Sequence, residues 1–494
     1  MTEDKSRKAS LEFAKMNMIA VSNERYHSWF DRERNAEALR EYTLEEVERI
    51  IQSGSLHEQQ VLSRTYFYKN GYYAQILTYY STLLKYAGIL IPHPSFGQSL
   101  STPHIQKRYI QVLDYIDKMR LPVFLTNCSL RVLIDGAYYG IIIQLDKNKF
   151  TVLDLPCDYC CSRFKDLDGN DVVEFDVSYF NTIENEIVRK DVLSIYPKII
   201  KAAYDKYMSG KSNSRYVVLP AEICIYFSFF TNGRPPFLAL IPATIEYDDA
   251  VKNNRDKDAE EIKKIIVQQI PHLSDGRLLF EPQEAEEIHA GAVGMMGKNP
   301  NVDVLTTYAD VDAIQSQTSS DVSKNSTLNQ MLKNIYTKSG TSAEIFSATS
   351  SSTLPISLKK DLAMMMYLGN KYSIFVTNIL NFLYQNSNVS FKYQILPISY
   401  FNSEDYVDKS FKLAGSGYSY LLPALALGIS QKDLIDLKDL ENNMLKLEEV
   451  LIPLQSSYTQ SGEVGRPKKA QEEKAEQTIA NENSQDNVAR EGSE

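Results

Sequence analysis

The sequence predicts an α+β fold, on the basis of two hydrophobic patterns and the composition. Through residues 356–385, large apolar residues recur at steps of three and four in two adjacent stripes, as on a long helix buried on more than one side. Between residues 123 and 180 the period changes to two, which indicates antiparallel strands. Hydrophobic residues make up 43% of the 494 residues, so the chain can bury a sizeable core, divided among about three domain-sized units.

The first part of the chain is predicted to be helical. Residues 1–60 have the pattern of solvated helices, and Thr43 followed by Glu46 is typical of a capping box. Residues 61–91 are predicted to form one helix, which apolar and Tyr side chains surround almost completely and which ends at the Pro-His-Pro that follows. Residues 104–119 are predicted to form a third helix.

A β region follows, because runs with a period of two are separated by Asp-Gly and Asp/Asn turn signals. In chain order the predicted elements are strands in 123–136, 137–155 and 171–180, a helix over 191–208, and strands over 215–219 and 222–230.

Two polar helices with a small irregular segment between them are predicted next. The elements are a charged helix over 245–270, strands around 277–281 and 302–306 on either side of an acidic turn and a Gly/Met/Asn loop at 291–301, and a helix over 309–338. A loop at 316–327, which is rich in Ser and Thr, is the alternative for the middle of the last helix. Residues 339–354 are predicted to be a Gly/Ser/Thr loop that leads into the long helix.

The C-terminal part is predicted to be short and mostly helical. The elements are a strand pair or one bent strand at 389–400 and helices over 403–414, 418–427 and 431–450. Ser430 is the expected N-cap of the last helix. From residue 459 on there is no Leu, Phe, Tyr or Trp, so we predict a disordered tail.

The charge and the cysteines limit the class of protein. A net charge of −10 argues against a protein that grips DNA or an anionic membrane electrostatically, but it does not exclude a protein that lets DNA pass without binding it. Five cysteines, an odd and sparse number, indicate a reducing compartment and no disulfide framework. No signal peptide is expected, because the charged N-terminus is followed by no hydrophobic stretch. The apolar runs fall short of the ~18 residues that span a bilayer.

No motif in the sequence predicts a catalytic, metal or cofactor site. Cys157, Cys160 and Cys161 contain one CxxC, but neither a second CxxC nor a pair of histidines supplies the other zinc ligands, so we interpret them as structural. The six histidines are isolated, and the glycines at 291–297 lack the spacing of a phosphate loop. The acidic groups at 246–249 and 284–287 are interpreted as solvated faces, with binding of a divalent cation as the alternative.

The order of these parts resembles the portal proteins of tailed bacteriophages. GAYYGIIIQLDKNKFTVLDLPCDYC and the strand in 171–180 are similar to the wing domain of that family. SGTSAEIFSATSSSTLPISLKKDLAMMM is similar to its tunnel loop and long wing helix, and residues 390–434 are similar to its strand and crown. The resemblance covers about residues 60–470, including the start of a GRPKK tail at Gly465, and leaves the first 60 residues unplaced.

This resemblance implies a portal-like fold with an α/β wing, a two-helix stem, a small α/β clip, a long buried wing helix and a helical crown. The implied division is an N-terminal helical segment 1–60, wing 61–244, stem helices 245–270 and 309–338, clip 271–308, tunnel loop 339–354, long wing helix and strand 355–402, crown 403–458 and disordered tail 459–494.

The resemblance also implies a structural protein without enzymatic activity. Such a subunit forms a dodecameric ring at one vertex of the capsid, and the ring is the channel for packaging and ejection of dsDNA. The implied partners are the terminase large subunit, the head–tail adaptor, and the major capsid and scaffolding proteins; assembly takes place in the host cytoplasm without a membrane. The alternatives are another virion structural protein, such as a minor head or adaptor component, and an enzyme that uses the cysteine cluster.

Two groups of residues are the expected sites of this function. Hydroxyl groups in the loop and two lysines at its base are expected to face the DNA, since Ser and Thr make sequence-indifferent phosphate contacts. These residues are Ser347, Thr349, Ser350, Ser351, Ser352, Lys359 and Lys360. The residues of the clip that are expected to contact the terminase and the adaptor are Glu284, Glu286, Glu287, His289, Met295, Met296 and Lys298.

Overall fold

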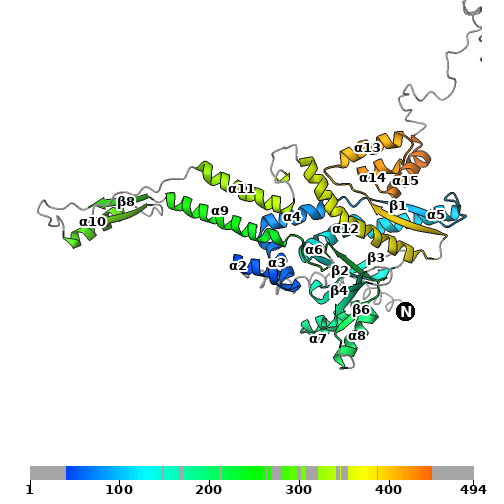
Figure 1. Ribbon diagram of the computed structural model, residues 1–494, viewed down its shortest axis with the longest axis horizontal. Coiled ribbons are helices and arrows are strands. Elements are labelled where there is room, and N and C mark those ends of the chain that lie inside the picture. The colour runs from blue at the N-terminus through cyan, green and yellow to red at the C-terminus, as the bar shows by residue number, and fades with distance from the viewer. Residues whose placement is uncertain are drawn as a thin grey trace, which may run out of the picture. The chain divides into compact units, whose positions relative to one another are not determined.

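Helices and small sheets alternate along the chain, so the predicted α+β class is confirmed (Figure 1). The structure is a computed structural model. It describes residues 41–145, 150–165, 171–210, 214–230, 232–262, 264–269, 281–296, 302–307, 321–340, 345–346, 354–385 and 388–447. The chain divides into two units, Met1–Leu434 and Ile435–Glu494.

The N-terminal helices differ from the prediction by one break. They are α2 (Leu44–Ser53), α3 (Leu56–Lys69) and α4 (Gly71–Thr82). The predicted capping box of α2 is confirmed, because Thr43 and Glu46 exchange hydrogen bonds between their side chains and backbone N–H groups. The prediction of one helix over 61–91 is wrong. Asn70 ends α3 and caps α4, with its side-chain oxygen accepting a hydrogen bond from the Tyr73 N–H at 2.9 Å.

A strand replaces the end of that predicted helix. β1 (Gly88–Pro94) pairs antiparallel with β10 (Val389–Ile395), so segments about 300 residues apart lie side by side. Pro92 is tolerated inside β1 because the strand has a single partner strand. The helix predicted over 104–119 is confirmed as α5 (Pro103–Met119).

The strand predicted over 123–136 is wrong, because these residues belong to the helix α6 (Leu121–Asp135). Leu121, Leu125, Cys128 and Val132 lie at helical spacing and are all buried in the core, which a strand with one buried face would not explain. The helix ends at Gly136, with φ of 80°, where a Cβ would collide with the backbone at residues 233–235.

Two three-stranded antiparallel sheets form the β region. Their strands are β2 (Ala137–Leu145), β3 (Phe150–Asp154), β4 (Cys160–Lys165), β5 (Asp171–Asp176), β6 (Tyr216–Leu219) and β7 (Cys224–Ser228). The strand orders are β3–β2–β7 and β4–β5–β6. The predicted strands in 137–155, 215–219 and 222–230 are therefore confirmed. The one predicted over 171–180 ends at Asp176 and continues as a 3-10 turn.

The helix predicted over 191–208 is two helices, α7 (Glu186–Ile195) and α8 (Lys198–Met208). Pro197 lies between them. A proline lacks the N–H donor and disfavours the helical conformation of the residue before it, so the chain turns at this point.

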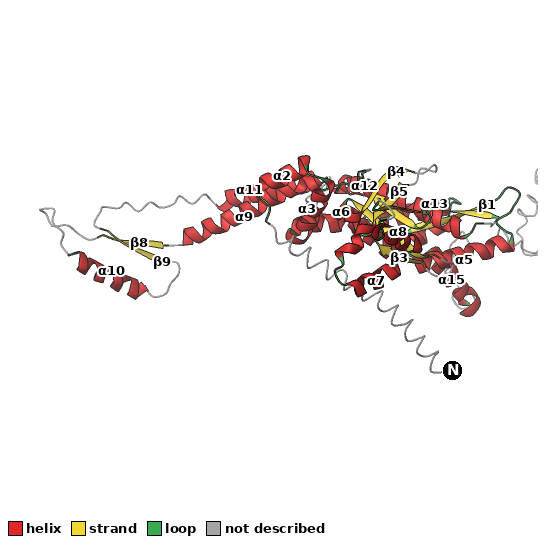
Figure 2. Cartoon of the chain, turned by 90° about the horizontal axis from the view of Figure 1, so that it is seen from below, coloured by secondary structure: helices red, strands yellow, loops and turns green. Residues whose placement is uncertain are grey.

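Two long helices, α9 (Ile241–Ile262) and α11 (Asp321–Ser339), pack side by side in both views (Figures 1 and 2). The helix predicted over 245–270 ends earlier, because the β-branched run at 264–269 forms the strand β8 (Lys264–Gln269). Residues 309–320 of the helix predicted over 309–338 lie outside the described residues, and α11 covers 321–327, part of the stretch for which a loop was the alternative.

Between α9 and α11 the chain forms a small helix-and-strand unit. The predicted strand at 302–306 is confirmed as β9 (Val302–Thr307), which pairs in parallel with β8. The predicted acidic turn and the start of the predicted loop at 291–301 are instead the helix α10 (Pro282–Met296), whose Glu and Ala residues are good helix formers. The strand predicted around 277–281 lies, apart from Glu281, outside the described part of the chain.

The predicted long helix is confirmed as α12 (Leu354–Leu383). Besides its apolar contacts, it bonds the edge of β10 that faces away from β1. Ser373, Thr377 and Asn381 accept hydrogen bonds of 2.9, 3.0 and 2.9 Å from the backbone N–H groups of alternate β10 residues, which are Ile395, Tyr393 and Phe391. Four helical residues rise ~6.0 Å and two strand residues ~6.6 Å, so the two spacings match.

Short helices follow β10, as predicted. They are α13 (Ser403–Gly415), α14 (Leu421–Leu427) and α15 (Gln431–Asp439). The predicted N-cap is confirmed, because Ser430 Oγ accepts a hydrogen bond from the Asp433 N–H at 3.0 Å. The last helix was expected to reach residue 450, but α15 ends at Asp439. In the second unit the π-helical turn Leu440–Met444 follows, and Lys438 bonds Glu441 at 2.7 Å.

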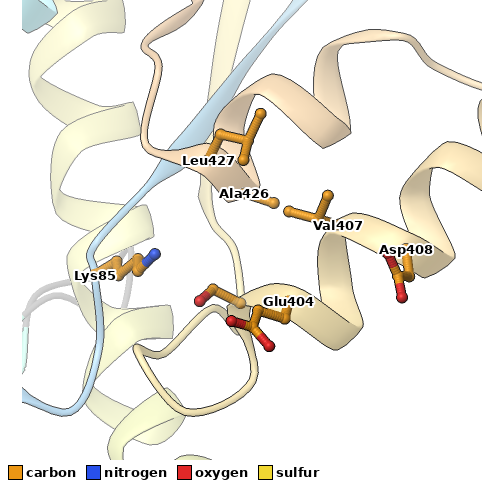
Figure 3. Close-up of a pocket in the computed structure, with 7 residues that line it drawn as sticks. Lys85, Glu404, Val407, Asp408, Ala426 and Leu427 are labelled. Carbon is orange, nitrogen blue, oxygen red and sulfur yellow. The ribbon is translucent and has the colours of Figure 1, made fainter.

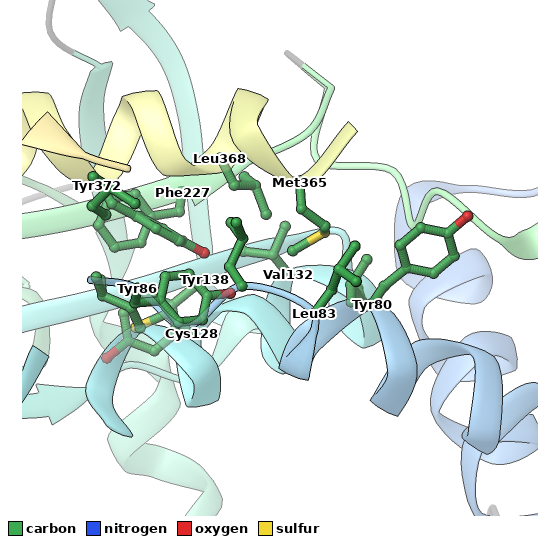
Figure 4. Packing of buried hydrophobic residues seen from close by; sticks show 14 of the residues in the cluster. Tyr80, Leu83, Tyr86, Cys128, Val132, Tyr138, Phe227, Met365, Leu368 and Tyr372 are labelled. Carbon is green, nitrogen blue, oxygen red and sulfur yellow. The ribbon is translucent and has the colours of Figure 1, made fainter. Parts of the chain in front are cut away.

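Two large hydrophobic cores, and a small third cluster around Ile398 and Leu425, hold the first unit together. The larger core gathers α3, α4, α6, α12 and the β1–β10 pair, and Met365, Leu368 and Tyr372 point into it from α12 (Figure 4). The smaller core lies among β2, β5, α7 and α8 and includes Phe175 and Phe180. The long helix is thus the element around which the larger core is packed.

Candidate functional site

The hydroxyl residues expected to face DNA lie outside the described residues. These are Ser347, Thr349, Ser350, Ser351 and Ser352. Lys359 and Lys360, the other members of the group, are exposed in the first turns of α12. The structure therefore describes the base of the hydroxyl-rich segment, where α11 ends and α12 begins.

Both sides of this base are tied to α4, the α12 side through a buried carboxylate and the α11 side through the Tyr80 hydroxyl. Asp361, only 1% exposed, accepts a hydrogen bond of 3.0 Å from the Tyr79 hydroxyl on one oxygen and lies 3.0 Å from the Tyr80 hydroxyl on the other. The Tyr80 hydroxyl also lies 3.2 Å from the carbonyl oxygen of Ser339, the last residue of α11. Tyr80 thus bridges the end of α11 and the start of α12.

The protonation of Asp361 follows from this arrangement. Burial, which penalises the charged form, raises the pKa of Asp361, and the hydrogen bonds from Tyr80 and Tyr79 oppose this. Asp361 and the Ser339 carbonyl both lie within hydrogen-bond distance of the Tyr80 hydroxyl. In its protonated form Asp361 can donate to Tyr80, so that Tyr80 donates to Ser339; in its ionised form Asp361 only accepts.

Aromatic rings close the same base. Phe346 stacks on Tyr336 of α11, with ring centroids 4.6 Å apart and planes at 16°. It also meets Tyr79 of α4 edge to face at 5.4 Å. A ring held on two sides fixes the backbone near residue 346 against the helices. We call Tyr79, Tyr80, Tyr336, Phe346 and Asp361 the loop-base cluster.

The residues expected at the clip are placed only in part. Glu284, Glu286 and Glu287 are exposed on α10, and His289 is half-buried on the same helix. The backbone of Met295 and Met296 forms the end of α10, and Lys298 lies outside the described residues. The structure thus gathers the three glutamates and His289 on one helix. At the start of α10, the Glu281 N–H donates a hydrogen bond of 3.1 Å to the Glu284 side chain. Ala285, the next residue of the helix, is buried.

The cysteine cluster lies beside a buried ion pair. Arg64 of α3 donates two hydrogen bonds, of 2.8 and 2.9 Å, to Asp158 and also bonds Asp135, at the end of α6. Burial alone would raise the pKa of Asp158, but hydrogen bonds from His57 and the charge of Arg64 lower it. Burial raises the pKa of the Cys160 thiol well above its ordinary value, so this thiol is neutral at physiological pH and a poor nucleophile. The arrangement ties the helical core to the β region.

A shallow pocket of about 370 Å³ lies against α13 and α14 (Figure 3). Val407 and Ala426 give it an apolar wall, and Lys85, Glu404 and Asp408 carry charges at its edge. In the described part of the chain, no three or more His, Cys, Asp and Glu side chains are arranged to hold a metal ion. Among the described helices, none has the length and hydropathy needed to cross a membrane.

Comparison with solved structures finds chains of gene transfer agent particles. One is in the virion of a native particle, and another is in the neck of an empty particle. Each is 11% identical to this chain, matches it with a TM-score of 0.42 over 75% of its length, and is itself covered to 93% or 94%. No protein-family model and no curated protein matches the sequence. At this identity and TM-score we draw neither a family nor an activity from the likeness.

The sequence patterns missed the loop-base cluster. Its signal was present, since Asp361 is the only acidic residue in the long helix 354–383 and Tyr79-Tyr80 is a pair of phenols in another buried helix. A lone carboxylate in an apolar helix indicates a buried hydrogen-bonded site. Which partners it meets depends on how α4, α11 and α12 pack, and no local pattern carries that information.

Proposed function

We propose that the chain is the portal subunit of a tailed-phage-like particle, a structural protein that forms a ring around a DNA channel at one vertex of the capsid. The observation that carries the proposal is the loop-base cluster. A hydroxyl-rich segment, 341–353, leaves the end of α11 and returns at the start of α12, and Tyr80 and Asp361 hold both sides of its base against α4. A rigid base with a polar segment beyond it suits a loop that touches a moving polymer.

The electrostatics of the chain fit a channel rather than a DNA clamp. Many lysines or arginines on the wall would bind phosphates by counterion release and would stall the DNA. Here the segment 341–353 has one acidic residue and no basic residue, and the cations near it in the chain are Lys338, Lys359 and Lys360. Ser and Thr hydroxyls at 347 and 349–352 are the proposed weak, sequence-indifferent phosphate contacts.

The same proposal assigns the stem, the clip and the remaining partners. The helices α9 and α11 are the proposed stem, and the unit of β8, α10 and β9 is the proposed clip. Within it, the glutamates of α10 with His289, Met295, Met296 and Lys298 form the proposed docking surface for the terminase and later the head–tail adaptor. A dodecamer is proposed, with the major capsid and scaffolding proteins as further partners.

Replacing residues 341–353 with a short Gly-Ser linker tests the role of the loop. We expect rings with a central hole, as seen by negative-stain microscopy, together with a clear loss of DNA packaging or of DNA retention in assembled particles. As a matched control, the exposed turn at residues 95–102 is replaced by the same type of linker, which leaves packaging unchanged. Normal packaging without the loop would reject its role, and a purified wild-type chain that never forms a ring would reject the portal assignment in favour of another virion protein.

A further inference from the structure

The outward face of α12 differs from the exposed face of an ordinary surface helix. The helix buries Met365, Leu368 and Tyr372 in the core, and its opposite face should then carry charges. Instead, the exposed residues from 363 to 382 are all uncharged. They are Ala363, Tyr367, Asn370, Ile374, Asn378 and Phe382. We call these six residues the α12 outward face.

Its large side chains are well exposed. Ile374 is 59% exposed and Tyr367 50% exposed. Phe229 stacks on Tyr367, with ring centroids 6.2 Å apart, and Phe230 beside it is 50% exposed, so the apolar surface extends sideways from the helix. By contrast, the exposed face of α5 surrounds Ile110 with Lys107, Asp114 and Lys118. An uncharged surface with large exposed apolar side chains is typical of a contact site.

The chemistry of the face does not suit tight binding of DNA, as distinct from the weak contacts proposed for the loop. Between residues 362 and 383 the helix has one charged side chain, Lys371, and its ammonium group donates a hydrogen bond of 2.6 Å to the Ser228 carbonyl and lies over the Tyr367 ring. Binding to the phosphate backbone needs several available cations. A protein surface is therefore the fitting partner.

The net charge of the chain indicates which protein is the partner of this face. Copies with a net charge of −10 repel each other, and they meet most favourably through a surface that exposes no carboxylate. The α12 outward face has none, because Asp361, the single acidic residue of the helix, is buried on the other side. A foreign partner would impose this condition only if it were acidic as well.

The size of the face supports the same partner. The face runs from residue 363 to residue 382, so at ~1.5 Å per residue and a width of ~10 Å it offers roughly 300 Å². A stable interface buries about 800 Å² on each partner. The face is thus one part of a larger contact, as in a ring where several elements of a subunit meet each neighbour.

We infer that the α12 outward face is covered by a second copy of this chain. The inference rests on the proposed ring and names one of the surfaces that close it. The contact is heterologous, since the neighbour contributes a different surface to it.

The test compares Ile374→Asp with Ile110→Asp, the same change at an exposed apolar residue of α5 that a charged surface surrounds. We expect Ile374→Asp to remain folded by circular dichroism but to shift from rings to dissociated subunits in light scattering, with at least a tenfold loss of assembly at equal concentration. Ile110→Asp is expected to assemble as the wild type does.

A second measurement reads burial directly, without relying on loss of assembly. Ile374→Cys and Ile110→Cys are labelled with a thiol reagent, and mass spectrometry of peptides separates each introduced thiol from the native cysteines. We expect the thiol introduced at position 374 to be protected at least tenfold in rings relative to dissociated subunits. The thiol introduced at position 110 is expected to be labelled equally in both.

Four outcomes would contradict the inference. Rings of Ile374→Cys in which the introduced thiol is fully labelled, or rings formed normally by Ile374→Asp, would overturn it and leave the portal assignment intact. Protection of the introduced thiol only after another virion protein is added would also overturn it. A wild type that never assembles would overturn both proposals.

Discussion

At the scale of single residues, Asp361 is the group on which the candidate site depends. It is buried in an apolar helix, and its raised pKa has burial as the main cause. Between the ordinary carboxyl pKa of about 3.9 and this raised value, the folded protein binds more protons than the unfolded chain. The stabilising contribution of Asp361 is therefore complete below the ordinary pKa and is lost as the pH rises through the raised value.

Asp361→Asn isolates this effect, because the amide keeps the shape of the side chain and does not titrate. An amide donates to Tyr80 and accepts from Tyr79, as the protonated acid does. We expect the free energy of unfolding of the variant, measured by urea titration at several pH values, to stay level above the ordinary carboxyl pKa while that of the wild type falls. At neutral pH the variant should be more stable, by about 1.4 kcal/mol for each unit of the pKa shift.

The control for this change is Asp405→Asn on α13, at an exposed carboxylate that forms only a loose pair with Lys409 at 4.0 Å. Its pH profile should parallel that of the wild type, since exposed pairs contribute little. If Asp361→Asn also followed the wild-type profile, the carboxyl group of Asp361 would not be the titrating group of the loop base.

At the scale of elements, hydrogen bonds to α12 satisfy the backbone N–H groups on the edge of β10 that has no neighbouring strand. The polar residues Ser373, Thr377 and Asn381 stand four apart on one side of α12 and take the place of a second neighbouring strand. Removing any one of these side chains leaves a backbone N–H of β10 without its acceptor. An unpaired buried donor costs more than the hydrogen bond itself contributes.

Thr377→Val tests this arrangement, because valine has the same shape and cannot accept the hydrogen bond from Tyr393. We expect a loss of about 1–3 kcal/mol in the free energy of unfolding, measured by denaturant titration with an unchanged slope. Thr337→Val on α11 is the matched control. Thr337 is exposed and bonds only a carbonyl of its own helix, so the change there should cost less than about 0.5 kcal/mol. Equal losses at the two positions would mean that β10 does not depend on α12.

The same elements explain what the sequence could and could not predict. The capping box at Thr43, the strands within 137–155 and the long helix depend on neighbouring residues, and their patterns were sufficient. The strand β1 and the helix α6 depend on partners far along the chain, and there the local pattern misled. The sequence did not predict the hydrogen bonds from α12 to β10 or the cluster around Asp361 for the same reason. Their partners are set by how distant elements pack together.

At the scale of the whole molecule, the distribution of charge explains how an acidic chain can associate with itself. Exposed helices such as α5 and α9 carry both acidic and basic residues, and the α12 outward face has neither. Placing the contact there removes apolar surface from water and brings no carboxylates together. The free energy of association then adds to the stability of each folded subunit, since only folded subunits bind one another.

This coupling predicts that the melting temperature of the wild-type chain rises with protein concentration, because dilution dissociates the assembly and removes its contribution. Ile374→Asp should melt at a temperature that is independent of concentration and equal to that of the diluted wild type, since the exposed side chain adds little to the fold of one subunit. Ile110→Asp should behave as the wild type does. The measurement is scanning calorimetry over tenfold steps of concentration, with light scattering of the same samples to record assembly. The same concentration dependence in Ile374→Asp and the wild type would mean that the stabilising contact between copies lies elsewhere on the subunit.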